Sequence, residues 1–130
     1  MTNKKLTILT CMDSRLDPIK ISGIAQGEAY IIRNAGGRAS EEAIDSMILT
    51  EKLFDVREWW VIHHSDCLMG NLQDHQVSAL PETIRENIFL DLEKSVIDDI
   101  DLIKSHESVP DHVEIKGFIY DLEESLLRPI

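Results

Sequence analysis

Short apolar runs alternate along this chain with longer segments whose apolar residues recur every three or four positions. The short runs predict buried strands over residues 5–10, 29–34, 59–63 and 113–120, with a short antiparallel strand at 126–127. The periodic segments predict helices over 40–54 and 91–104, the first capped by Ser40. A short helix is predicted to begin at Asp17-Pro18 and to end at Gly23.

Strands that alternate with helices are typical of βαβ units, which build a mainly parallel sheet flanked by helices. The 130 residues contain no repeat, linker or low-complexity tract, so we expect one α/β domain spanning 1–130. In such sheets, ligands bind beyond the carboxyl ends of the strands, where the strand order reverses. If the strand order is 2-1-3-4, the ends of the first and third strands are neighbours at that point.

The net charge of the chain limits the classes of molecule that it can bind. Asp and Glu number 24 against 13 Lys and Arg, which gives a formal charge of −11 and disfavours nucleic acid or an anionic membrane as partner. Hydrophobic residues make up 43% of the chain, enough for a packed core, but no apolar run is long enough to span a membrane. With no signal-peptide core and only two cysteines, we expect a cytoplasmic protein with reduced thiols.

Three side chains stand where the first and third predicted strands end. Cys11 follows the first strand directly, and His64 and Cys67 follow the third, two residues apart from each other. Zinc takes thiolate and imidazole ligands, and catalytic zinc sites use three protein ligands and one open position. The spacing therefore suggests a zinc site, although buried structural side chains, or a disulfide between the two cysteines, are alternative interpretations.

Asp13 and Arg15 lie within four residues of Cys11 and can pair side by side at a metal, or simply form a loop ion pair. A phosphatase-type cysteine loop is excluded, because it needs five residues between Cys and Arg and here there are three. The negative net charge also opposes binding of an anionic substrate.

Three motifs together resemble the β-class carbonic anhydrases: CMDSR at 11–15, IRNAG at 32–36 and HHSDC at 63–67. The resemblance implies one Zn²⁺ per chain, held by Cys11, His64 and Cys67, with Asp13 and Arg15 as the catalytic dyad. It also implies the 2-1-3-4 sheet, a homodimer or larger assembly, and hydration of carbon dioxide, a small neutral triatomic substrate.

The second motif supports the site in this family, and Gly36 and Gly37 fit where backbone approaches closely beside the substrate pocket. Leu68 stands where the family usually has Gly, so the pocket rim becomes more apolar. The family's N-terminal arm and substrate-reaching Gln cannot be placed, because the chain begins ten residues before Cys11.

Three functions therefore remain open: a carbonic anhydrase, a carbonyl sulfide or carbon disulfide hydrolase on the same fold, and a zinc-binding module without turnover. Leu68 favours the second, since its substrates are larger and less polar. For the dimer, aromatic residues around the third strand, among them Trp59 and Phe54, predict a subunit seam there and at the first helix.

Overall fold

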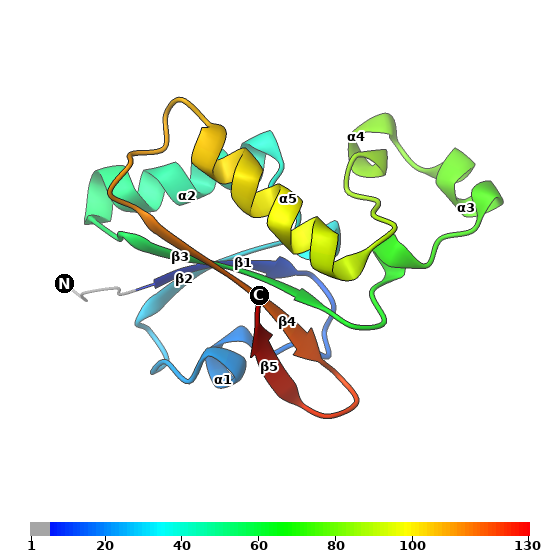
Figure 1. The fold of residues 1–130 in the computed structure, drawn as a ribbon, viewed down its shortest axis with the longest axis horizontal. Helices are drawn as coiled ribbons and strands as arrows, with labels where there is room; N and C mark the ends of the chain where they lie inside the picture. Colours follow the sequence, from blue (N-terminus) through cyan, green and yellow to red (C-terminus); the bar gives the residue numbers. More distant parts are fainter. Residues whose placement is uncertain (1–5) are drawn as a thin grey trace.

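The computed structural model describes residues 6–130, which form a five-stranded sheet in the order β2-β1-β3-β4-β5 (Figure 1). The strands are β1 (Leu6–Cys11), β2 (Ala29–Asn34), β3 (Glu58–His64), β4 (Glu114–Asp121) and β5 (Leu126–Pro129). The first four pair in parallel, and β5 returns antiparallel to β4. The predicted fold class and strand order are confirmed; Lys5, assigned to the first strand, lies outside the described residues.

Two layers of helices cover the sheet (Figure 1). The main helices are α1 (Pro18–Ser22), α2 (Glu41–Phe54) and α5 (Leu92–Ser105). Figure 1 shows α2 and α5 on one face of the sheet and α1 on the other. The α2/α5 face holds the largest apolar cluster, which includes Leu9, Met47 and Val96. On the α1 face, Ile8 and Ile62 pack against Ile21.

Local sequence signals place the helix ends. The side chains of Asp17, Ser40 and Asp91 accept hydrogen bonds from backbone amides in the first turns of α1, α2 and α5, respectively. These bonds satisfy amides that have no partner inside the helix. Gly23 ends α1 with φ of 73°, a left-handed conformation that costs glycine little.

The segment between β3 and α5 carries structure that the sequence pattern did not predict. It contains the 3₁₀ turn η2 (Leu68–Gly70) and two short helices, α3 (Asp74–Ala79) and α4 (Glu82–Arg85). Neither short helix has a buried residue, so no apolar periodicity marks them in the sequence. A second 3₁₀ turn, η1 (Ala35–Gly37), directly follows β2.

The predicted subunit seam cannot be formed by β3 and Trp59, while its part at Phe54 and at the first helix stays a prediction. Strand β3 lies between β1 and β4, so neither of its edges is free to pair with another chain. Trp59 is fully buried in the α2/α5 core, where its indole N–H donates to the Val56 carbonyl oxygen at 3.1 Å. Within residues 6–130, no helix is long and apolar enough to cross a membrane.

Candidate metal centre

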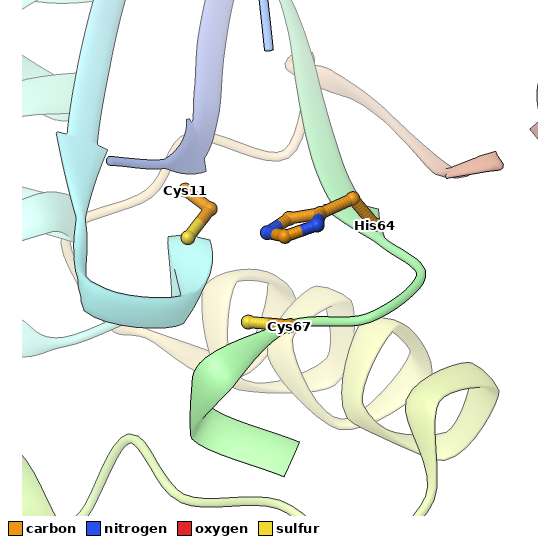
Figure 2. A group of neighbouring side chains, drawn as sticks. All are labelled: Cys11, His64 and Cys67. Atoms are coloured by element: carbon orange, nitrogen blue, oxygen red, sulfur yellow. The ribbon is translucent and has the colours of Figure 1, made fainter. Parts of the chain in front are cut away.

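Cys11, His64 and Cys67 meet at the carboxyl edge of the sheet (Figure 2). Cys11 ends β1, His64 ends the neighbouring β3, and Cys67 follows in the next turn. Their ligating atoms all lie within 4.8 Å of one another, and all three residues are buried. The convergence expected from adjacent strand ends is therefore present, while zinc ligation itself stays a prediction.

A hydrogen bond to the backbone sets which nitrogen of the His64 ring is free to bind a metal. Its Nδ1 lies 2.7 Å from the Ser65 carbonyl oxygen, which can only accept, so Nδ1 carries the proton and donates it. The lone pair is then on Nε2, which is buried and lacks a hydrogen-bond partner within the described chain. Figure 2 shows a ring nitrogen directed toward the two sulfur atoms. One imidazole lone pair and two thiols are the donor set of a zinc site with an open fourth position.

The two thiols are electrostatically coupled. The pKa of Cys11 is lowered to about 4, chiefly because the Cys67 thiol donates a hydrogen bond to it; burial opposes this shift, and the amides of Asp13 and Gly36 add to it. That contact with Cys11 raises the pKa of Cys67, and burial adds to the rise. The pair alone thus holds one negative charge, whereas a divalent cation stabilises both thiolates.

Turn η1 closes one side of the cluster. Gly36 and Gly37 have positive φ values of 87° and 65°, and both are buried. A Cβ atom on Gly37 would lie 2.8 Å from the Cys11 backbone nitrogen, so no side chain fits there. The predicted close backbone approach is present, but it is made to the ligand strand; the placement of these glycines in a substrate pocket stays a prediction.

Asp13 and Arg15 form a forked pair beside the cluster. Arg15 donates from Nη2 to Asp13 Oδ2 at 2.7 Å and from Nε to Oδ1 at 3.1 Å, and its backbone amide donates to the same Oδ1. These hydrogen bonds lower the pKa of Asp13 to about 2, so the group is a carboxylate at every working pH. The carboxylate is thereby held toward Arg15, as the resemblance implies for a dyad.

The edge of the site is open to solvent. Arg15 lines a hollow of about 660 Å³ together with Asp66, Tyr120 and five neighbouring residues. Two apolar side chains flank the ligands and are well exposed: Met12 at 61% and Leu68 at 60%. Each is next to a metal-binding residue in sequence, and the place of Leu68 in a substrate pocket stays a prediction.

Sequence reasoning missed several residues that hold this site. Asp66 accepts a hydrogen bond from Arg15 Nη1 at 3.1 Å and has a positive φ of 53°. The only sequence signal for that backbone conformation is the residue type, since Asp adopts positive φ more often than most residues. Arg33, placed only loosely beside the site, donates to the carbonyl oxygens of Cys11 and Asp13 at 2.9 and 2.6 Å.

Fold and site together define an α/β protein with a candidate Cys₂His metal centre at the carboxyl ends of parallel strands. The family model described as carbonic anhydrase matches residues 6–87. The β-carbonic anhydrase 1 of Mycobacterium tuberculosis is 29% identical over 135 residues, covering 98% of this chain and 83% of that protein. The chain therefore belongs to the β-class carbonic anhydrase family.

Two further similarities bear on the chemistry. The crystal structure of a carbonic anhydrase from Streptococcus mutans superposes with a TM-score of 0.90 at 33% identity, covering 100% of this chain and 85% of that one. A carbon disulfide hydrolase of Acidithiobacillus thiooxidans is 31% identical over 154 residues, covering 98% of this chain and 77% of that protein. Relatives with two different substrates thus share this fold.

Proposed function

We propose that this protein is a zinc-dependent carbonic anhydrase that hydrates carbon dioxide reversibly to bicarbonate. The observation that carries the proposal is the Nε2 atom of His64, which has no hydrogen-bond partner among residues 6–130 and is buried against two thiols, next to a forked Asp–Arg pair. Cys11, His64 and Cys67 would hold one zinc ion per chain. When bound, zinc supplies Lewis-acid activation of water at neutral pH.

The chain's own residues do the remaining work. Asp13 accepts a hydrogen bond from the attacking water and orients it, because its carboxylate stays ionised. Arg15 holds that carboxylate in place through its fork and is itself supported by Asp66. The burial of all three metal-binding residues excludes bulk water from the side of the centre that faces the protein.

The surroundings suit a small neutral substrate. Met12 and Leu68 are exposed apolar side chains next to metal-binding residues in the chain, and we expect them to favour entry of a nonpolar molecule. The net charge of −11 does not hinder a neutral triatomic substrate, and it favours release of an anionic product.

Hydrolysis of carbon disulfide or carbonyl sulfide is the second candidate. Leu68, where the family usually has glycine, enlarges the apolar rim and suits these less polar substrates. The similarity to a carbon disulfide hydrolase supports the same candidate. The metal centre and the dyad would serve both reactions, so the rim decides between them.

We further propose that the protein works in the cytoplasm as a homodimer or larger homo-oligomer, without nucleic acid or membrane as partner. Strand β2 is an edge of the sheet and pairs, within the described residues, only with β1. Exposed Leu53 and Phe54 on α2 extend an apolar surface to this edge, where Phe54 stacks on Tyr30. Sedimentation at tens of micromolar tests association; a fully active monomer would contradict it.

Stopped-flow hydration of carbon dioxide and release of sulfide from carbon disulfide and carbonyl sulfide, measured on one zinc-loaded sample, test the function. We expect rapid hydration and slow sulfide release. The reverse ranking would make the chain a hydrolase of sulfur compounds. No turnover in either assay, at one zinc per chain, would reduce it to a metal-binding module.

A further inference from the structure

A buried charged network lies on the opposite side of strand β3 from the His64 ring. Its centre is Asp99 of α5, whose side chain is 1% exposed. Arg38 grips both carboxylate oxygens, from Nε to Oδ2 at 2.8 Å and from Nη2 to Oδ1 at 3.1 Å. His63, also 1% exposed, brings Nε2 to 3.1 Å from Oδ2. Burial favours a neutral Asp99, but the hydrogen bonds from His63 and Arg38 outweigh it and lower the pKa of this carboxyl.

The side chains of this network bond to turn η1 directly or through the segment at Asn87 and Ile88. His63 Nε2 lies 3.0 Å from the Gly37 carbonyl oxygen; both of its neighbours there are acceptors, so it donates. Arg38 Nη1 donates to the carbonyl oxygens of Asn87 and Ile88 at 3.0 and 3.3 Å. Asn87 Nδ2 in turn donates to the Ala35 carbonyl oxygen at 2.8 Å. Two of the three carbonyl groups of η1 are therefore fixed by side chains of this network.

Turn η1 acts directly on a metal-binding residue. The Gly36 amide hydrogen-bonds to the Cys11 sulfur. Gly37 packs so closely on the Cys11 backbone that even a Cβ atom would clash. A shift of the turn thus changes both the position of Cys11 and the charge on its sulfur.

We propose that Asp99 is a positioning residue of the metal centre, which acts through Arg38 and His63 to fix η1 with the Gly36 amide directed at the Cys11 sulfur. A buried ion pair contributes little net stability compared with apolar packing, which gives its placement against this turn a functional meaning. An N–H···S bond withdraws electron density from the thiolate. The network therefore sets how strongly Cys11 binds the metal and how acidic the centre is.

This inference rests on the proposed zinc site and is tested on the zinc-loaded and cobalt-loaded chain. Asp99→Asn keeps the shape of the side chain and removes the charge that orders Arg38. We expect zinc affinity, measured by competition with a chromogenic chelator, to fall by about 10–100-fold, as for other outer partners of metal ligands. The sulfur-to-cobalt charge-transfer band should shift, and the pH midpoint of hydration should rise.

Glu51→Gln is the matched control. Glu51 is also a nearly buried helical acid bonded to a histidine, with Oε2 at 3.2 Å from His112 Nε2, but it lies on α2 and its ion-pair partners among the described residues are His112 and Lys52, which are not part of η1. It should lower stability and leave zinc affinity and the cobalt band at wild-type values. Arg38→Lys keeps the charge but loses the fork, so it should change affinity in the same direction by less; it serves as the test if Asp99→Asn does not fold.

The proposal is overturned if the wild type binds zinc and Asp99→Asn, or Arg38→Lys in its place, retains the same zinc affinity and cobalt band. It is also overturned if Glu51→Gln changes both readouts as much. A wild-type chain that binds no zinc contradicts the proposed function and this inference together, and wild-type zinc content reports that case separately.

Discussion

His63 and His64 are neighbours in strand β3, identical in type and equally buried, yet their surroundings differ completely. Because side chains alternate across a strand, the two rings lie on opposite faces of the sheet. Both nitrogens of His63 have partners: Nδ1 lies 2.7 Å from Ser95 Oγ, and Nε2 contacts Gly37 and Asp99. His64 has one partnered nitrogen and one without a partner among residues 6–130.

The difference shows that hydrogen-bond partners, and not residue type or burial, distinguish the two rings. Buried polar groups are nearly always hydrogen-bonded, because leaving one unpaired costs about 1–3 kcal/mol. His63 meets that requirement and, in our proposal, supports turn η1 without contacting the metal. His64 violates it with its lone pair directed at two thiols, which a bound cation would correct.

Truncating each histidine in turn is the strongest test of whether the two have different roles. In His64→Ala we expect zinc affinity to fall by more than ~100-fold, since even the outer partners of ligands are worth about 10–100-fold. His63→Ala should still reach one zinc per chain at saturating metal, and its main loss should be stability, about 1–3 kcal/mol from unpaired buried groups. Metal analysis after gel filtration and urea unfolding measure the two effects. Equal zinc loss in both variants would remove the distinction.

The second prediction concerns the solvent-facing dyad. Arg15→Ala frees the Asp13 carboxylate, which we expect to take the open coordination position and block water. Hydration near neutral pH should then fall by about 100-fold and its rise should move to higher pH, while zinc content stays the same. Arg15→Lys should restore part of the rate, because an ammonium supplies charge without the planar fork. Stopped-flow profiles at matched zinc content measure this; superimposable profiles for all three proteins would leave Asp13 and Arg15 a structural pair.

The Asp13–Arg15 pair also predicts a small change in folding stability at acid pH. The pKa of Asp13 is about 2 in the folded chain and returns toward the ordinary value of 3.8 without Arg15. A lowered folded pKa stabilises above the unfolded value and loses that contribution as pH falls through the folded one. The wild type should therefore have this contribution in full above about pH 5 and lose it progressively as pH falls toward 2, and Arg15→Ala should not have it at any pH. Unfolding curves between pH 2 and 6, which cover this window, report the difference between the two chains.

A smaller contrast separates two adjacent acids of α5. Asp98 is exposed and pairs with Lys94 at 2.8 Å, whereas Asp99 is buried against Arg38. Asp98→Asn should change stability by at most ~0.5 kcal/mol and Asp99→Asn by about 1–2 kcal/mol. Because the pKa of Asp99 is lowered, its contribution is complete above ~pH 4 and lost as pH falls further. Chemical denaturation of both variants from pH 3 to 7 tests this; equal losses at neutral pH would contradict it.

The sequence predicted the parallel sheet and the meeting of Cys11, His64 and Cys67, because both depend on local pattern. Apolar runs mark the strands, and ligands at adjacent strand ends must converge. It could not predict the surroundings of His63, since the partners of this residue are distant in sequence: Ser95 is 32 positions away. Aromatic residues around β3 suggested a subunit seam, but Trp59 is core, because burial depends on the helices that cover the strand.

X-ray absorption at the zinc edge of the loaded wild-type chain tests the central claim most directly. Two cysteine ligands and one histidine predict two sulfur atoms at about 2.3 Å and one imidazole nitrogen at about 2.0–2.1 Å, with a light atom in the fourth position. A zinc shell without sulfur would place the metal elsewhere and leave the partnerless His64 nitrogen without the role assigned to it.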